Sequence, residues 1–331
     1  MHFHLTPEQT AIQDAVRGTL ADHWPMERLH AFADGADDFD RASWDALMAL
    51  GIGGLLAPDS GMGLLEAALV CEIAGEAAAP GPLIGQLLAV AAVACSGDAA
   101  AKAHLDGLAG GTKVAALVDG GSAYVACARA ADLFLIVDRA AGVRLVAAAD
   151  ATIEAVPASD RSRPVSKVGV AADAGTALFA ASDPMTARLA DAALVLVAAD
   201  ALGGAQKVTD MSVAYAKERE QFGQPIGRFQ GLKHQLAHMA LDVEPARALV
   251  WYAAYAWDSQ LPDAPRAAAM AKAHLCDVYV RATRAAVAAH GGIGYTWEYG
   301  LHYWFRRAAF DRAWLGSPAA HRARAAALAG W

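Results

Sequence analysis

The spacing of apolar residues changes twice along this chain of 331 residues, and these changes constrain its fold more than any other feature. Apolar residues recur at helical spacing as far as Gly110, short β-rich segments follow, and helical spacing returns at Asp183. The sequence therefore predicts an α+β fold that is mostly α. We expect a helical domain at residues 1–110, a compact β domain at 111–182 and a second helical domain at 183–331.

The first helix begins at a capping motif. Thr6 is an N-cap, Pro7 suits the first turn, and Gln9 is placed to complete a capping box. Farther on, Gly-rich turns at residues 51–54 and 58–63 interrupt the apolar helical stretches. We therefore expect separate helices in the first domain.

The middle of the chain is typical of short strands. Turn residues separate segments that are rich in β-branched and large apolar residues, as in a meander or a small barrel. The expected strands are residues 113–118, 133–137, 143–147, 152–156, 165–170 and 176–180.

Long helices are predicted for the last domain. The first starts at Asp183, and its Gly203-Gly204 pair would allow a neighbouring helix to pack closely. The second should be kinked at Pro245. The third ends at His290, before an aromatic and basic segment that closes the chain.

Charge, hydropathy and cysteine spacing argue against several classes of protein. The net charge of −8, with no cluster of Lys and Arg, argues against a nucleic-acid partner. The most apolar runs, at residues 87–94 and 192–199, are too short to cross a membrane, and the N-terminus lacks the pattern of a signal peptide. Four widely spaced cysteines predict buried thiols in a reducing cytoplasm, with neither disulfides nor a metal site: Cys71, Cys95, Cys127 and Cys276.

Residues 217–230, KEREQFGQPIGRFQ, run from the end of a predicted helix into a turn. Glycine and proline alone would end the helix, so Arg219 and Phe222 need another explanation. In one interpretation Arg219 belongs to a solvated helix end. In the other, its guanidinium binds phosphate oxygens, because the dipole at a helix C-terminus would by itself repel an anion, while Phe222 covers a flat ring.

The segment HGGIGYT at residues 290–296 also has two interpretations. Gly291 is well placed as a helix C-cap, the most frequent use of glycine there. Gly291 and Gly292 together would also let a large ligand approach the backbone, because neither carries a side chain.

Combined with the order helices, strands, helices, these motifs resemble those of the acyl-CoA dehydrogenase family. YAKEREQFGQPIGRFQ (215–230) and HGGIGYTWEYGLHYWFRRA (290–308) carry the resemblance, and LTPEQ with ALGIGGLLAPDSGMG (49–63) is similar to the family's N-terminal domain. The resemblance covers nearly the whole chain. It implies an N-terminal helical domain, a central β domain that is reduced here, and a C-terminal four-helix bundle. It also implies FAD held across a subunit interface and oxidation of an acyl-CoA to the 2-enoyl-CoA.

The resemblance assigns cofactor-binding residues and no metal ligand. Arg219 and Phe222 match the family's R-x-x-F-G motif, which contacts the FAD diphosphate region of an adjacent subunit. The other matches are Gln221 beside the diphosphate, Gln230 at the adenine end, and Gly291-Gly292 where the dinucleotide approaches the backbone.

The family's catalytic glutamate has no counterpart here. Family enzymes remove the α-proton with this carboxylate while hydride goes to the flavin. Its usual position, in a Y-E-G-T-like motif, matches Leu315 in WLGS (314–317), and its alternative position falls at about Ala193-Leu194. None of these side chains is a base, so we expect no catalytic residue in this chain.

The β domain also departs from the family. Residues 114–137 lack the T-E-P…G-S-D loop and the K-x-x-I-T-N-like strand that hold the isoalloxazine. Ala288 replaces a glutamine three residues before the glycine pair, and Arg306-Arg307 replace an R-D pair. The half of the site that would hold this chain's own flavin ring is therefore missing.

These matches and departures favour a non-catalytic subunit of a heteromeric acyl-CoA dehydrogenase. A homologous partner would carry the catalytic glutamate, and this chain would complete the partner's FAD site. The arrangement resembles the α2β2 enzymes of steroid side-chain degradation. Two alternatives stay open: a self-contained homomeric dehydrogenase with a displaced base, for which Asp311 is the candidate, and a flavin-free scaffold or acyl-CoA-binding protein.

Overall fold

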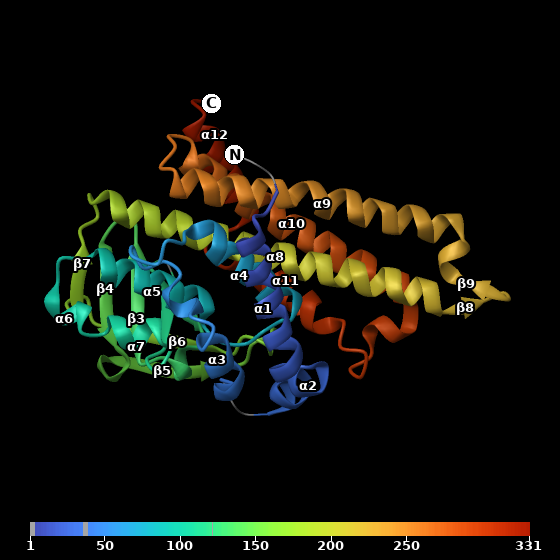
Figure 1. Ribbon diagram of the computed structural model, residues 1–331, viewed down its shortest axis with the longest axis horizontal. Coiled ribbons are helices and arrows are strands. Elements are labelled where there is room, and N and C mark those ends of the chain that lie inside the picture. The colour runs from blue at the N-terminus through green and yellow to red at the C-terminus, as the bar shows by residue number, and fades with distance from the viewer. Residues whose placement is uncertain (1–3, 36–38, 121) are drawn as a thin grey trace.

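Helices occupy both ends of the chain, and a small β domain lies between them (Figure 1). The computed structural model describes residues 4–35, 39–120 and 122–331, so the first three residues of the segment examined for a signal peptide lie outside it. Among the described helices, none is long and apolar enough to span a bilayer. The prediction of a mostly helical fold with a sheet domain between helical domains is confirmed.

One of the N-terminal helices, α5 (Leu83–Cys95), is buried along nearly its whole length. That helix, α5, packs against the first strand and against the long helix α8. The predicted capping box is present, because Thr6 Oγ1 accepts from Gln9 N and Gln9 Oε1 accepts from Thr6 N. The helices are α1 (Pro7–His23), α2 (Met26–Asp34), α3 (Arg41–Met48), η1 (Ile52–Gly54), α4 (Leu64–Glu76), α5 (Leu83–Cys95), α6 (Ala99–Lys102) and α7 (Leu105–Ala109).

The β domain consists of two sheets, so the prediction of a meander or small barrel is wrong. One sheet has the order β1-β3-β4-β7, and the other has the order β2-β6-β5. The chain crosses to the second sheet between β1 and β3, so β3 returns parallel to β1. The strands are β1 (Ala115–Asp119), β2 (Tyr124–Ala126), β3 (Leu133–Asp138), β4 (Gly142–Ala147), β5 (Ala151–Val156), β6 (Val165–Val170) and β7 (Thr176–Phe179), with short 3-10 turns η2 (Ala128–Ala130) and η3 (Ala148–Asp150).

The first sheet is buried on both faces. Alternate side chains such as Phe134 and Val146 pack into a small core shared with the second sheet. The intervening side chains, such as Leu135 and Leu145, join the main core beneath the helices. Burial of both faces explains why residues 133–137 of β3 are all apolar, with the acidic Asp138 only at the end of the strand.

The last part of the chain is built on three long helices that run alongside one another (Figure 1). The β domain lies at one end of α8, and a small hairpin lies at the other. The elements are α8 (Pro184–Glu218), β8 (Glu220–Gln221), β9 (Gln224–Pro225), η4 (Ile226–Arg228), α9 (Gln230–Asp258), α10 (Ala264–His290), η5 (Gly291–Tyr295), α11 (His302–Ala313) and α12 (Pro318–Leu328). Helix α9 continues through Pro245, so this proline does not end it.

Small residues let α8 approach its neighbours. A Cβ on Gly203 would lie 1.8 Å from the carbonyl oxygen of Glu72 on α4, and a Cβ on Gly204 would lie 2.2 Å from the ring of Tyr279 on α10. Real Cβ contacts are never this short, so the predicted close packing at this glycine pair is confirmed.

The cysteines are free thiols. Cys71, Cys127 and Cys276 are buried as predicted. Cys95 is exposed, so the prediction is wrong for it, because it is the last residue of α5, where the helix emerges at the surface.

Candidate functional site

The motif around Arg219 forms a hairpin at the end of α8. Glu220 pairs with Pro225 and Gln221 pairs with Gln224, which leaves Phe222 and Gly223 as the loop. Both loop residues have positive φ, 52° and 76°, as a type I′ hairpin requires. A bulky residue rarely adopts such a φ, yet Phe222 does, and it is 92% exposed.

The polar residues of this hairpin present their side chains to solvent. Arg219 is the C-cap of α8, and its backbone is tied down by Tyr215 O and Ile226 N. Its side chain is exposed and makes no ion pair with any other residue that the structure describes. Gln221 Nε2 donates to the carbonyl oxygen of its neighbour Glu220, and Gln230 is exposed as the first residue of α9.

The glycine pair follows the end of α10. Gly291 is the C-cap, with φ of 64°, so a glycine is required there by the backbone. Gly292 has no such requirement. A Cβ on either residue would meet no other atom within 4 Å, so the chain's own packing leaves open space beside this backbone.

A stacked pair of rings brings the hairpin and the glycine pair to the same end of the bundle. Tyr215, four residues before Arg219, stacks on His290 with ring centroids 4.6 Å apart. His290 Nδ1 donates to Ala286 O at 2.7 Å, so Nε2 accepts from the Tyr299 hydroxyl at 2.9 Å. Burial lowers the pKa of His290, which favours this neutral form.

The two positions that would supply a catalytic carboxylate line one cavity. Leu315 and the pair Ala193-Leu194 share a cavity of about 280 Å³ between α8, α12 and the ends of β1 and β3. Carboxylates do reach this cavity from the β domain, through Asp119 and Asp138. Asp138 Oδ1 accepts from the backbone N–H groups of the turn at residues 140–141, so that oxygen is already engaged.

The backbone at Leu315 is strained. Its φ is +58°, in a region that bulky side chains rarely adopt, and Gly316 follows with φ of 101°. His321 Nε2 lies 2.8 Å from Leu315 O, and buried Lys272 donates from Nζ to Gly316 O at 3.3 Å. The loop is thus held in a defined conformation although it carries no reactive side chain at this position.

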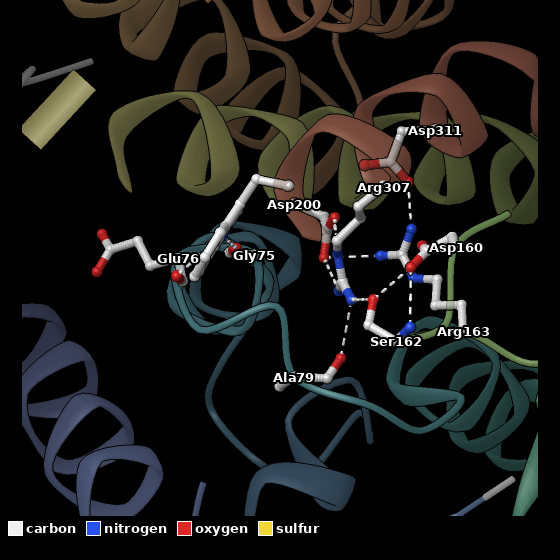
Figure 2. A network of polar contacts seen from close by, with 10 residues as sticks. Gly75, Glu76, Ala79, Asp160, Ser162, Arg163, Asp200, Arg307 and Asp311 are labelled. Carbon is white, nitrogen blue, oxygen red and sulfur yellow. Dashed lines mark hydrogen bonds and ion pairs between the residues drawn. The ribbon is translucent and has the colours of Figure 1, made fainter. Parts of the chain in front are cut away.

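Next to this loop, a buried ion cluster joins α8, α11 and the segment between β5 and β6 (Figure 2). Arg307 bonds both oxygens of Asp200, with Nε–Oδ2 at 3.0 Å and Nη2–Oδ1 at 2.6 Å. Its remaining nitrogen, Nη1, donates to Ala79 O and to Ser162 Oγ, each at 3.0 Å. All donor nitrogens of this guanidinium are therefore used inside the chain.

Arg163 is the second cation of the cluster. Its guanidinium pairs with Asp311 and, at 2.8 Å, with Asp200 Oδ1. It also lies over the rings of Phe310 and Trp314, with centroids 5.4 and 5.7 Å away. Trp314 directly precedes Leu315, so the cluster and its aromatic cover lie beside the position matched to the catalytic base.

Comparison with known proteins shows which family this chain belongs to. Residues 6–112 match the acyl-CoA dehydrogenase N-terminal domain, and residues 186–329 match the acyl-CoA dehydrogenase C-terminal domain. Acyl-CoA dehydrogenase IpdE2 of Mycolicibacterium smegmatis is 31% identical over 95% of this chain and 96% of its own length. The chain belongs to the acyl-CoA dehydrogenase family.

Solved structures agree with this assignment. A variant of the steroid ACAD Tcur3481-Tcur3483 superposes with a TM-score of 0.87, at 27% identity over 98% of each chain. The ChsE4-ChsE5 complex of Mycobacterium tuberculosis, at 22% identity, has the same fold, with a TM-score of 0.84 over 98% of this chain and 97% of that one.

Asp311, the candidate displaced base, is poorly placed for catalysis in this acyl-CoA dehydrogenase chain. It is fully buried in the ion cluster, and it does not line the cavity that contains Leu315 as the structure describes it. Burial raises the pKa of Asp311 well above the usual range. The negative charge of Asp200 raises this pKa further, and the positive charge of Arg163 lowers it. These contacts assign Asp311 to the cluster.

Sequence reasoning missed the cluster. Arg163 lies in a β5–β6 loop that carries no recognisable motif. Asp200 did give a signal, because it interrupts an apolar helical run and a buried carboxylate there needs a cationic partner. The departure at Arg307 was visible too, but its partner 107 residues away was not. Among the described residues, no group of three or more His, Cys, Asp and Glu side chains is arranged to hold a metal ion.

Proposed function

We propose that this chain is a non-catalytic subunit of a heteromeric, FAD-dependent acyl-CoA dehydrogenase and that it completes the FAD site of a homologous partner. The proposal rests on a difference between two sets of matched residues. The residues matched to a neighbour's cofactor are exposed. The positions matched to this chain's own chemistry lack a base and adjoin a buried ion cluster.

The exposed half fits a dinucleotide. The exposed guanidinium of Arg219, which makes no ion pair with another described residue, suits phosphate oxygens, and the exposed ring of Phe222 offers a flat apolar surface. The open backbone at Gly291 and Gly292 leaves room for a large ligand. Gln221 in β8 and Gln230 at the start of α9 add exposed amides. When bound, FAD would supply the hydride acceptor for oxidation of the acyl-CoA, and these residues would bind and orient it.

This chain's own half does not fit catalysis. Leu315 and Ala193-Leu194 place only apolar groups where the resemblance expects a carboxylate, so the partner would carry the glutamate. The guanidinium groups of Arg163 and Arg307 are engaged by Asp200 and Asp311, so neither is available to hold a flavin ring. The cluster stabilises the remodelled interior instead.

The alternatives make different predictions. A self-contained homomeric dehydrogenase would need another base, and Asp119 and Asp138 are the carboxylates that reach the cavity. A flavin-free scaffold or acyl-CoA-binding protein would leave Arg219 and Phe222 without a use. The exposure of these two side chains favours the shared FAD site.

The substrate class rests on similarity. The protein with 27% identity over 98% of both chains is a steroid ACAD whose name pairs two components. We propose by analogy that the acyl-CoA carries a bulky steroid side chain and that the complex is heterotetrameric. Free thiols are in keeping with a cytoplasmic enzyme of β-oxidation.

Co-expression with the product of an adjacent dehydrogenase-like gene tests the proposal. We expect a yellow complex that contains about half as much FAD as chains, because only one subunit type would cradle the flavin ring. Purified alone, this chain should be colourless or aggregated, since its partner surface would be exposed. A yellow, active homotetramer obtained without a partner would contradict the proposal.

A further inference from the structure

In the proposed FAD site, the groups that would meet one dinucleotide lie at the ends of different helices. The Arg219 hairpin follows α8, and the glycine pair Gly291-Gly292 follows α10. A binding site loses affinity when its groups are about 1 Å out of place. The two helix ends must therefore be held in a fixed relative position.

The hairpin is fastened to the last turn of α8. Arg219 N donates to Tyr215 O at 2.8 Å, and Ile226 N, on the return of the hairpin, donates to Arg219 O at 2.8 Å. A Cβ on Gly227 would lie 2.8 Å from Ala216 O, so the segment after the hairpin lies against this turn as well. The hairpin therefore follows the position of the turn that carries Tyr215.

The glycine pair itself is loosely packed, and the residue before it is firmly held. A Cβ on Gly291 or Gly292 would meet no other described atom within 4 Å. His290 directly precedes them, is only 4% exposed, and donates from Nδ1 to Ala286 O at 2.7 Å. The backbone then folds back over this residue, since a Cβ on Gly294 would lie 3.1 Å from His290 Cβ. The position of the glycine pair is thus set from His290.

Three rings join the two helix ends. The His290 ring stacks on Tyr215 with centroids 4.6 Å apart and contacts the Tyr299 ring at 4.9 Å. Tyr215 and Tyr299 also meet edge to face, at 6.1 Å. The Tyr299 hydroxyl donates to His290 Nε2 at 2.9 Å, so both imidazole nitrogens are bonded and the ring cannot turn.

We propose that His290 is a positioning residue of the FAD site. Its fixed ring holds the Arg219 hairpin at one distance from Gly291-Gly292, so that a single dinucleotide meets both. The inference rests on the proposed function. A buried apolar side chain could fill the same space, but it could not bond the Tyr299 hydroxyl and the Ala286 carbonyl at once.

Titration of the apo-complex with FAD tests this role. His290→Leu removes the ring and both hydrogen bonds, and it should weaken FAD about tenfold. His290→Phe restores the stack on Tyr215 and should recover part of the loss. Thr283→Val, two turns earlier on α10, is the matched control. It removes the hydrogen bond from the buried Thr283 side chain to Val280 O and should leave FAD affinity unchanged.

Hydrogen exchange of the complex without FAD reports on the hairpin independently of the cofactor. In His290→Leu, the amides of Arg219 and Ile226 should exchange about tenfold faster than in the parent, because a loosened last turn of α8 opens their hydrogen bonds more often. Thr283→Val should exchange at the rate of the parent. Unchanged exchange in His290→Leu would overturn the inference.

Arg219→Ala separates this inference from the proposed function. Since His290 acts partly through the hairpin, adding His290→Leu to Arg219→Ala should cost no more than about threefold in FAD affinity. An equal cost with and without Arg219→Ala would overturn the inference. So would a parent-like affinity of His290→Leu while Arg219→Ala weakens FAD, and in that case the proposed function would stand. If neither single variant weakens FAD, both fail.

A milder variant keeps the test decisive if His290→Leu does not fold, which circular dichroism would show. Tyr299→Phe removes only the hydroxyl that donates to His290 Nε2. It should weaken FAD by about two- to tenfold and speed exchange of the same two amides. Parent-like values of both quantities in Tyr299→Phe would overturn the inference.

Discussion

Arg307 and Asp200 form a two-point ion pair in the interior, 107 residues apart in sequence, with nitrogen–oxygen distances of 3.0 and 2.6 Å. The pair fastens α11 to α8. Both side chains are almost completely buried, at 2% exposure each, so neither charge can be compensated by water if the other is removed.

Removal of this cation should destabilise the chain strongly. Arg307→Met keeps most of the volume and leaves Asp200 short of a partner, and we expect a loss of about 3–5 kcal/mol in the free energy of unfolding. Arg312→Ala, on the same helix, breaks an exposed ion pair with Asp277 and should cost about 0–1 kcal/mol. Urea unfolding measures both. Similar losses in the two variants would show that burial of the Arg307 pair is not what makes it important.

Stability should depend on pH through Asp311. Burial, assisted by Asp200 and opposed by Arg163, raises its folded pKa above the ordinary value of about 3.9. Between those two values the native state holds a proton that the unfolded state lacks, so the free energy of unfolding of the parent falls as pH rises. The slope for one proton is at most about 1.4 kcal/mol per pH unit.

Asp311→Asn should remove this contribution. Its amide keeps an acceptor for Arg163 and cannot titrate. We therefore expect the stability of the variant, relative to the parent, to increase as pH rises from about 4.5 until the folded pKa of Asp311 is passed. Urea unfolding across this range checks the sign, and parallel curves for parent and variant would refute it.

The same substitution should have opposite effects at two glycines. Gly203→Ala would place a Cβ 1.8 Å from Glu72 O, so α4 and α8 must separate, at a cost of about 1–3 kcal/mol. Gly18→Ala lies within α1 with no atom in the way and should stabilise the chain by about 0.5–1 kcal/mol. Thermal unfolding gives both signs, and a stabilised Gly203→Ala would contradict the close approach of these helices.

Arg219→Ala should loosen FAD from the complex without changing the secondary structure. An exposed helix-end arginine contributes little to folding, whereas a hydrogen bond to a charged group contributes about 1.5–3 kcal/mol to binding, roughly ten- to a hundredfold in affinity. Arg219→Lys should restore only part of this, since an ammonium lacks the bidentate geometry. Titration of apo-complex with FAD measures the effect.

Lys217→Ala is the matched control for that titration. Lys217 lies two residues away on the same exposed helix end and has no counterpart in the cofactor motif. If Arg219→Ala binds FAD as tightly as the parent, Arg219 does not bind the cofactor and belongs to a solvated helix end.

The cavity carboxylates distinguish the proposed complex from a self-contained enzyme. If the partner carries the base, Asp119→Asn and Asp138→Asn in this chain should leave turnover by the complex within about twofold of the parent, because a catalytic base contributes about 10²–10⁴-fold. A loss of a hundredfold in either variant would identify a displaced base in this chain.

Local sequence was enough to predict most of the elements, although strand β2 (Tyr124–Ala126) was not among the expected strands. The capping box at Thr6, the start of the long helix at Asp183 and the end of α10 at Gly291 all depend on residues within about one turn of each other. Every expected strand is present because its apolar composition is local as well. The hairpin motif at Arg219 is likewise a continuous segment, so its exposed residues were recognisable from the sequence.

Only the tertiary structure decided which elements pair and which side chains contact one another. The parallel pairing of β1 with β3, the ion pair between Arg163 and Asp311 across 148 residues, and the shared cavity of Leu315 and Ala193 each join distant segments. Strand pairing and charge pairing depend on which surfaces the folded chain buries together, and local backbone preferences carry no information about that choice. The sequence by itself therefore determined most of the helices and strands and the exposed hairpin segment, and only the packed interior decided that buried ion pairs lie beside Leu315.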